Sequence, residues 1–303
     1  MATTTPKVIS DKNQMRNWSR SMRAQGKLIG FVPTMGLLHM GHLSLVSKAR
    51  SLCHVVAVSI YVNPAQYAPS DNISPYPSDF HADLRKLAAL PSGVDVVFHP
   101  RNLYDYGEDG GDVAVDVDGS GHESWVRVEK LQAGLCGKSR PVFFRGVATV
   151  VTKLFNIVEP DVAVFGKKDY QQWRIIQRMV RDLDFSIKVI GVEIVRESDG
   201  LAMSSRNMNL SPEEREKALS VSKSLLKAKS AAEDGKVHCE ELKNVAIQCI
   251  TDAGGRVDYA EFVDQNNLGI VEQMKGPVVF CIAAWFGKVR LIDNMEINFS
   301  KDV

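Results

Sequence analysis

Residues 27–42, KLIGFVPTMGLLHMGH, constrain the fold of this chain more than any other stretch. Residues 28–32 are an apolar run of strand length, and the Pro-Thr-Met-Gly sequence at 33–36 breaks that run as a turn. The apolar residues after His42 recur at approximately helical spacing. The segment therefore predicts a strand, a turn and a helix start, which in a parallel sheet is the edge where ligands bind.

Two histidines stand at this predicted helix start. His39 and His42 are three positions apart, which places them on the same side of the first helical turn. Gly41 has no side chain to keep a phosphate from the backbone, and the N–H groups of a helix start favour anions. The pair therefore points to phosphate binding, with a core and a surface histidine or a zinc site as the alternatives. The lack of Cys, Asp or Glu nearby argues against metal.

A second strand is predicted at residues 53–62, whose β-branched run is typical of a strand covered on both faces. With the first strand and helix it completes a βαβ unit. Asn63 and Gln66 follow its carboxyl end, and their uncharged amides suit a hydroxylated substrate. An Asx turn at Asn63 and plain exposure of Gln66 are the alternative explanation.

Helices and strands continue to alternate further along the chain. Helices are predicted at 15–25, 79–90 and 147–158, and strands at 94–98, 125–128, 161–165 and 187–195. This pattern predicts an α/β fold with a Rossmann-like, doubly wound parallel sheet. Residues 107–121 are rich in Gly and Asp and predict a surface excursion, because the closing glutamate of a calcium loop is absent.

A second turn with charged residues follows the strand predicted at 161–165. Residues 166–169 read Gly-Lys-Lys-Asp, and lysines beside a glycine suit phosphate binding. Asp169 suits a helix cap or a hydroxyl acceptor, and Gln172, one helical turn later, is expected to face the same opening. A solvated loop with a capping Asp is the alternative.

The C-terminal part of the chain has a different pattern. Ser204, Ser205 and Arg206 lie on a predicted loop and offer two hydroxyls and a guanidinium to a polyphosphate, although such a triplet is common by chance. A capping box at 211–214 starts a long helix, and a further helix and three strands follow. We therefore expect two domains: residues 1–195, the nucleotide-binding fold, and residues 196–303, a smaller α+β lid domain.

Composition narrows the cellular context. A formal net charge of +1 gives no case for nucleic acid as a partner, and the five cysteines, none in CxxC spacing, predict free thiols in a reducing compartment. The longest apolar run, 278–286, is about half a membrane span, and the N-terminal stretch lacks the apolar core of a secretory signal. A cytoplasmic protein without a membrane partner is expected.

Four segments, in this order, resemble the signatures of the pantothenate synthetase (pantoate–β-alanine ligase) family: VPTMGLLHMGH, SIYVNPAQY, FGKKDYQQ and GLAMSSRN. The resemblance extends from about residue 7 to 295 and includes AAWFGKVRLIDN. This family belongs to the nucleotidyltransferases with an HxGH motif, and Ser204-Ser205-Arg206 is similar to their second, KMSKS-type loop. The resemblance implies ATP-dependent condensation of pantoate with β-alanine through a pantoyl adenylate, with release of pyrophosphate and AMP.

The resemblance also implies roles for the matched residues. The catalytic residues would be His42, His39, Lys168 and Arg206. ATP would be bound by Pro33, Thr34, Met35, Gly36, His39, Gly41, His42, Gly166, Lys168, Asp169, Val195, Met203, Ser204, Ser205 and Arg206. Pantoate and β-alanine would be bound by Gln66, Gln172, Asn63 and Met35. Mg²⁺ would bridge phosphate oxygens, mostly through water and substrate rather than a protein metal site, and a homodimer is expected.

Two other functions stay open from the residues alone. One is another HxGH-type nucleotidylyltransferase, whose product would keep the AMP moiety, and the other is a non-catalytic nucleotide-binding protein. The amides of Asn63, Gln66 and Gln172 favour a small neutral polyol over a phosphorylated acceptor. The sequence departs from the family's usual pattern at Lys167, Cys136 and Phe143, so the resemblance assigns no site residues between 123 and 145.

Overall fold

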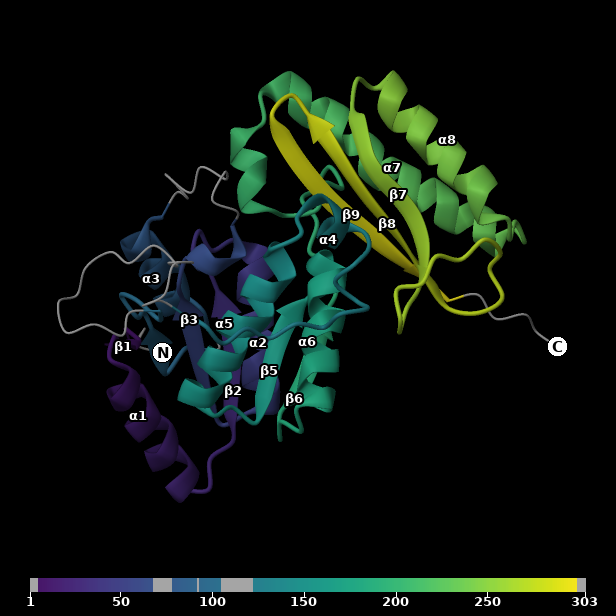
Figure 1. Ribbon diagram of the computed structural model, residues 1–303. Coiled ribbons are helices and arrows are strands. Elements are labelled where there is room, and N and C mark those ends of the chain that lie inside the picture. Colours follow the sequence, from purple (N-terminus) through teal and green to yellow (C-terminus); the bar gives the residue numbers. More distant parts are fainter. Residues whose placement is uncertain (1–4, 68–77, 92, 105–121, 299–303) are drawn as a thin grey trace. The chain divides into compact units, whose positions relative to one another are not determined.

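The computed structural model describes residues 5–67, 78–91, 93–104 and 122–298, and it divides the chain into two compact units (Figure 1). The first unit comprises Met1–Gln132, Arg140–Gly166 and Ile175–Val192. The second comprises Ala133–Ser139, Lys167–Arg174 and Glu193–Val303. The surface excursion predicted at 107–121 lies outside the described residues.

The first unit contains a six-stranded parallel sheet in the order β1-β4-β3-β2-β5-β6. Because β2 lies between β3 and β5, the strand order reverses at β2, which is the topological switch point of a doubly wound sheet. The predicted fold class is confirmed. The strands are β1 (Lys7–Ile9), β2 (Ile29–Thr34), β3 (Val55–Ile60), β4 (Val96–Phe98), β5 (Val162–Gly166) and β6 (Lys188–Val192).

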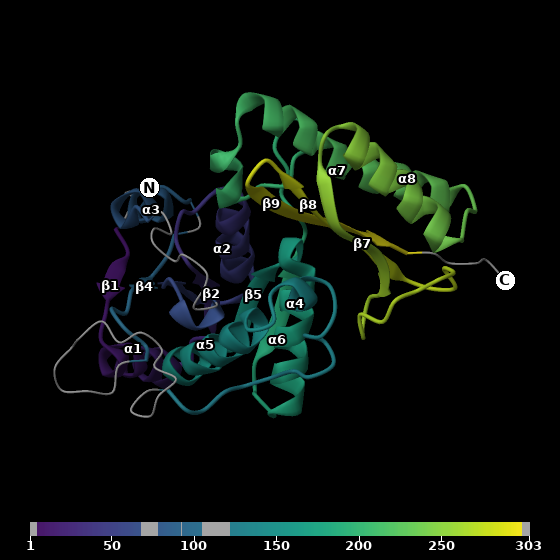
Figure 2. The same ribbon diagram turned by 45° about the horizontal axis from the view of Figure 1, so that its top comes forward.

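Helices cover both faces of this sheet (Figure 2). Val32 packs in a core with apolar residues of α2 and α3, whereas its neighbour Phe31 points to the other face and meets Phe155 of α5, with ring centroids 6.4 Å apart. This is the two-residue alternation of a strand buried on both sides. The helices are α1 (Lys12–Ala24), α2 (Met40–Leu52), α3 (Phe80–Ala88), α5 (Phe143–Val158) and α6 (Tyr170–Asp182), which belongs to this unit from Ile175 onward.

Two details differ from the sequence-based expectation. The turn was expected at Pro33, but β2 continues through Thr34. Because the Thr34 carbonyl accepts a hydrogen bond from Tyr61 on the β3 side, the Pro33 nitrogen faces β5, which pairs with β2 only further back, so no ladder bond is lost. The strand predicted at 125–128 is wrong: the Val126 N–H donates to the Thr149 hydroxyl instead of to a neighbouring strand.

The second unit is built on an antiparallel sheet of β7 (Arg256–Asp264), β8 (Val278–Phe286) and β9 (Val289–Ile297). Helices α7 (Pro212–Glu233) and α8 (Cys239–Asp252) cover one face of it (Figure 1). α7 starts with the predicted capping box of Ser211 and Glu214. The smaller α+β domain expected from the sequence is therefore present.

Strand β9 divides its side chains between two environments. Val289, Leu291 and Ile297 belong to the core beneath α7 and α8. The even-numbered Arg290, Asn294 and Glu296 point to the opposite face, where their partners come from residues 133–139, 167–174 and 258. This alternation explains why short segments from the middle of the chain belong to the second unit.

None of the described helices combines the length and the apolar character that crossing a membrane requires.

Candidate active site

The two histidines of the HxGH motif cap the helix that they begin. His39 is the N-cap of α2, and its Nδ1 accepts from the Gly41 N–H at 3.2 Å. The Nδ1 of His42 accepts from the His39 N–H at 3.3 Å, so the two rings form a reciprocal capping box with centroids 4.1 Å apart. Because each Nδ1 is an acceptor, each neutral ring carries its proton on Nε2. Nε2 is therefore the donor of both imidazoles.

A buried carboxylate fixes the turn that leads into this helix. Asp83 on α3 is 1% exposed and accepts from the N–H groups of Leu37 at 2.8 Å and Leu38 at 2.7 Å. Leu37 and Gly36 both have positive φ angles, 50° and 88°, so this backbone path is strained for ordinary residues. Asp83 therefore sets the position of His39. Sequence reasoning misses it, because nothing in its local pattern separates it from a surface acid.

The two amides after β3 form a buried, directed pair at η1 (Pro64–Gln66). Asn63 caps η1, since its Oδ1 accepts from the Ala65 N–H at 3.3 Å. Its Nδ2 donates to Gln66 Oε1 at 3.1 Å. Gln66 is only 7% exposed and its Nε2 lies 3.0 Å from the sulfur of Met35. The structure thus brings three predicted substrate-binding residues together, with the Gln66 N–H₂ group as a donor beside Met35.

Close backbone approach of α5 supports this amide pair. The Gly146 carbonyl accepts from Asn63 Nδ2 at 3.2 Å. A Cβ atom at Gly146 would overlap the carbonyl of Ala65, because α5 and η1 approach so closely here. Only glycine fits at this position.

The two lysines after β5 have different surroundings. η2 (Lys167–Asp169) follows the strand directly. The Lys167 ammonium donates to Glu193 at 2.5 Å and to Glu296 at 2.7 Å. Burial alone would lower the pKa of Lys167, but these two carboxylates raise it above its ordinary value. No described carboxylate lies within ion-pair distance of Lys168, so Lys168 is the lysine of this turn suited to an anionic ligand.

A hairpin brings two further predicted residues together. The Met203 N–H donates to the Val195 carbonyl at 3.0 Å, and the chain between them turns at Gly200, with φ 94°. Arg196, inside the hairpin, forms a two-pronged ion pair with Asp293 at 2.6 and 2.9 Å. Burial raises the pKa of Asp293, and the Arg196 guanidinium acts in the opposite direction.

The Ser-Ser-Arg triplet starts a short 3-10 helix, η3 (Ser205–Asn209). Ser204 is its N-cap, with the hydroxyl accepting from the Arg206 N–H at 3.2 Å. The Arg206 guanidinium donates to the Arg290 carbonyl at 3.2 Å, and Arg206 is otherwise exposed. Arg206 is thus placed by β9 with most of its donors directed to solvent.

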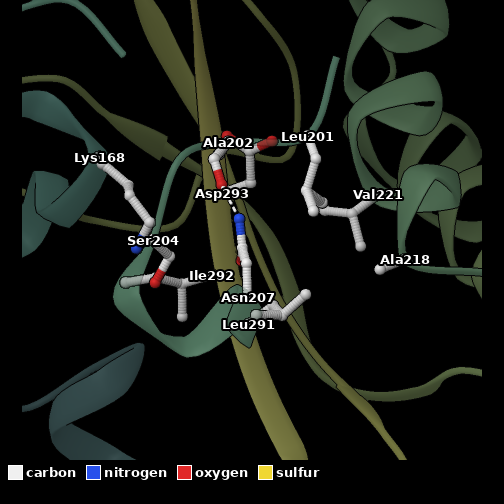
Figure 3. A pocket seen from close by; sticks show the side chains of 10 residues that line it. All are labelled: Lys168, Leu201, Ala202, Ser204, Asn207, Ala218, Val221, Leu291, Ile292 and Asp293. Atoms are coloured by element: carbon white, nitrogen blue, oxygen red, sulfur yellow. Dashed lines mark hydrogen bonds between the residues drawn. The ribbon is translucent and has the colours of Figure 1, made fainter. Parts of the chain in front are cut away.

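A small pocket in the second unit connects these segments (Figure 3). Lys168 and Ser204 both line it, so the structure brings these two predicted residues together. Asn207 lines it as well and donates to the Ala202 carbonyl at 3.0 Å. The remaining lining residues are Leu201, Ala202, Ala218, Val221, Leu291, Ile292 and Asp293.

The predicted site residues fall in both units. The first unit holds Pro33, Thr34, Met35, Gly36, His39, Gly41, His42, Asn63, Gln66 and Gly166. The second unit holds Lys168, Asp169, Gln172, Val195, Met203, Ser204, Ser205 and Arg206. Within the described part of the chain, no group of three or more His, Cys, Asp and Glu side chains is placed to hold a metal ion.

Comparison with known proteins gives consistent matches. Residues 7–296 match the family model described as Pantoate-beta-alanine ligase. A pantoate–β-alanine ligase of Lotus japonicus is 70% identical, covering 97% of this chain and 99% of the relative. The crystal structure of pantothenate synthetase from Thermus thermophilus is similar with a TM-score of 0.84 and 37% identity, covering 97% of this chain and 100% of that chain. A pantoate–β-alanine ligase from Francisella tularensis, complexed with β-γ ATP and β-alanine, has a TM-score of 0.74 and 33% identity, covering 96% and 97%.

Proposed function

Because this chain belongs to the pantoate–β-alanine ligase family, we propose how its own residues carry out the reaction of that family. The chain is an enzyme of ATP-dependent condensation, joining pantoate to β-alanine. Membership confirms the resemblance of the four signature segments. It also removes the two alternatives, a different HxGH-type nucleotidylyltransferase and a non-catalytic nucleotide-binding protein.

We propose two chemical steps. In the first, a carboxylate oxygen of pantoate attacks the α-phosphorus of ATP, the bond from that phosphorus to the bridging oxygen breaks, and pyrophosphate leaves. In the second, the amine of β-alanine attacks the acyl carbon, the bond from that carbon to the oxygen bridging it to phosphorus breaks, AMP leaves with that bridging oxygen, and the amine loses a proton. Substrate groups supply both nucleophiles, so the protein's tasks are alignment and neutralisation of phosphate charge.

The histidine capping box carries this proposal. His39 and His42 would donate from Nε2 to phosphate oxygens of ATP as negative charge develops there. The occupied Nδ1 atoms support this role, since they fix the tautomer that has its proton on Nε2. Pro33, Thr34, Met35, Gly36 and Gly41 would line the nucleotide on the same turn.

Cationic groups of the other segments would neutralise the remaining charge. Lys168 and Arg206 would bind phosphate oxygens, and Lys168 is favoured over Lys167 because the latter is paired with two glutamates. Gly166 and Asp169 would contact the nucleotide, with Asp169 on the ribose. Val195, Met203, Ser204 and Ser205 would bind adenine and triphosphate.

The amide pair would recognise pantoate. Gln66 would donate its N–H₂ to pantoate, because Asn63 already occupies its Oε1, and Gln172 and Met35 would complete the pocket. Gln66 would also lie near β-alanine. The Francisella relative is complexed with β-γ ATP and β-alanine, and we infer that this chain binds ATP and β-alanine as well.

Mg²⁺ is compatible with this set of residues if the ion is bound mainly by the nucleotide. The charged groups that we assign to the triphosphate are imidazole, ammonium and guanidinium, which are not magnesium ligands, so phosphate oxygens and water would supply most of the oxygen shell. Bound there, the ion would neutralise charge on the leaving pyrophosphate.

We also propose the wider organisation. Residues 1–195 would act as the catalytic domain and residues 196–303 as a smaller lid domain that limits hydrolysis of the adenylate. A homodimer in the cytoplasm is proposed, and the five free cysteines suit such a reducing compartment. Cell fractionation with detection of the chain would test the location.

Mixing ATP, Mg²⁺, pantoate and β-alanine with the enzyme should give pantothenate and AMP, both detected by mass spectrometry.

His42→Ala should lower pantoate-dependent ATP–pyrophosphate exchange by roughly 10²–10³-fold, because a donor to the developing charge is lost. His238→Ala is the matched control, since His238 is also a helix N-cap but makes no side-chain cap bond. Near-normal exchange by a folded His42→Ala variant would contradict the assignment.

A further inference from the structure

One asparagine of β9 holds the backbone of the lysine turn. Nδ2 of Asn294 donates to the carbonyls of Lys167 and Lys168, each at 2.9 Å. Asn294 is 5% exposed, so these bonds are shielded from competing water. Both hydrogens of its amide are used on this one turn.

A second residue on the same face of β9 holds the side chains of this turn. Glu296 accepts from Lys167 Nζ at 2.7 Å and from the Tyr170 hydroxyl at 3.1 Å. Lys167 is thereby anchored at its ammonium group and, through Asn294, at its carbonyl. Lys168 is held at its carbonyl by Asn294, so its side chain extends from a fixed backbone and lines the pocket together with Asp293, which attracts it electrostatically.

The same strand also supports the loop with the serines. Asp293 pairs with Arg196 of the hairpin between Val195 and Met203. The Arg290 carbonyl accepts from the guanidinium of Arg206. Residues 290, 293 and 294 of β9 therefore contact the serine loop, the hairpin and the lysine turn, the three segments of the second unit that we assign to the nucleotide.

We propose that Asn294 is a positioning residue for catalysis: it fixes the Lys167–Lys168 backbone so that the Lys168 ammonium reaches the phosphate under attack. This inference rests on the proposed function, in which Lys168 binds ATP. The required chemistry is specific, because two carbonyl oxygens call for two N–H donors on one planar group. A carboxylate at this position would face both carbonyls with oxygen and repel them.

Asn294→Asp tests the inference, because it keeps the shape of the side chain and replaces the donor by an acceptor. A displacement of about 1 Å at a catalytic group costs up to about 10²-fold, so kcat/KM for ATP should fall by about 10- to 100-fold. The KM for β-alanine should stay within about twofold. Lys168→Ala should lower kcat/KM for ATP by roughly 10²–10³-fold.

The decisive measurement is a double-mutant cycle. If Asn294 acts through Lys168, Asn294→Asp with Lys168→Ala should be no slower than Lys168→Ala alone. If the fold losses in kcat/KM of the two single variants multiply in the double variant, the inference is overturned and the proposed function still stands. Near-normal activity of Lys168→Ala would overturn both, so the two failures are distinguishable.

Gln265→Glu is the matched control. Its amide also donates to a backbone carbonyl of this sheet, that of Val278 at 2.9 Å, rather than to a carbonyl of the lysine turn. This variant should keep kcat/KM within about threefold of the unsubstituted enzyme. In the double variant with Lys168→Ala, the fold losses in kcat/KM of the two single variants should multiply. If Asn294→Asp does not fold, Asn294→Ser, which retains one donor, should give a smaller loss with the same non-additivity. Additive losses for Asn294→Ser would equally overturn the proposal.

Discussion

At the scale of single residues, Asn63 shows how one side chain supports both the fold and the amide pair that we propose for pantoate. Its oxygen caps η1, and its nitrogen orients the oxygen of Gln66. From the sequence, an Asx turn and a substrate amide are competing explanations. In the structure they use different atoms of one amide, so the Asx turn is present together with the amide pair.

Gln66→Ala should weaken pantoate binding by about 10- to 100-fold, because a buried donor to a charged ligand is lost. ATP affinity should change by less than about threefold. Titration calorimetry with each ligand separately measures both constants. The control is Gln248→Ala, an exposed glutamine of α8 whose amide bonds to Asp252. Equal weakening of both ligands by Gln66→Ala would count against a pantoate-specific role.

Thiol reactivity gives a second test at this scale. Burial raises the pKa of Cys53 and of Cys239 to about 11, with Asp161 adding to the effect at Cys53. At pH 8 only about one such thiol in a thousand is ionised, and thiolate is the reactive form. Cys249, which is half-buried, should therefore be alkylated first.

Iodoacetamide labelling at pH 8, followed by peptide mass spectrometry, measures these rates. Labelling in urea should remove the difference, because unfolding restores ordinary thiol pKa values. Modification of Cys53 in the folded enzyme at the rate of Cys249 would contradict the expectation.

At the scale of elements, the sequence predicts well wherever apolar residues recur with a clear period. α1, α3 and α5 begin and end within four residues of the bounds predicted at 15–25, 79–90 and 147–158. Residues 125–128 do not form the predicted strand, because they bond to side chains of α5 instead of to a neighbouring strand. The Thr149 hydroxyl accepts from the Val126 N–H, and the Arg145 guanidinium lies 4.1 Å from the centre of the Trp125 ring. β1 was not predicted, since three residues are too few for a period.

The site divides in a similar way. The histidines, amides, lysines and serines that we assign to ligands come from motifs that can be read locally. Asp83 and Asn294 act on backbone groups that lie 45 and 126 positions away in the sequence. Such contacts leave no local signal, because the bonded carbonyls and N–H groups belong to every residue type.

Gly146→Ala should be destabilising, although Gly→Ala in a helix usually stabilises. The added methyl would overlap the Ala65 carbonyl, so overpacking should lower the free energy of unfolding by about 1–3 kcal/mol. Pantoate affinity should fall as well, since η1 carries Gln66. Urea unfolding followed by circular dichroism measures the first effect.

Gly276→Ala serves as the comparison, because nothing lies within 4 Å of a Cβ there. Its free energy of unfolding should change by less than about 1 kcal/mol. If Gly146→Ala is as stable as this control, the close approach of α5 to η1 does not require glycine.

At the scale of the whole molecule, the two units alternate along the chain. Residues 133–139 and 167–174 precede the expected boundary at residue 195, yet they pack in the second unit. They do so because the outer face of the β7–β9 sheet offers polar partners, among them Arg290, Asn294 and Glu296. Each compact unit is therefore made of segments that are separated in the sequence.

The proposed homodimer gives a prediction for the intact chain. Static light scattering at micromolar concentration should give twice the mass of one chain, and the mass should fall toward one chain on strong dilution. A constant mass of a single chain at working concentrations would refute the dimer. Activity measured over the same dilution series would show whether catalysis depends on association.

The alternating pattern of β9 disfavours molecules in which this strand is paired in the wrong register. A slip of this strand by one position would exchange its two sets of side chains, placing Leu291 and Ile297 against polar partners and driving Arg290 and Asn294 into an apolar interior. Misregistered molecules would thus be unstable as well as inactive, and cellular proteolysis would remove them. The same alternation of side chains that fills the apolar core therefore also fixes the register of the polar residues that we propose to position the site.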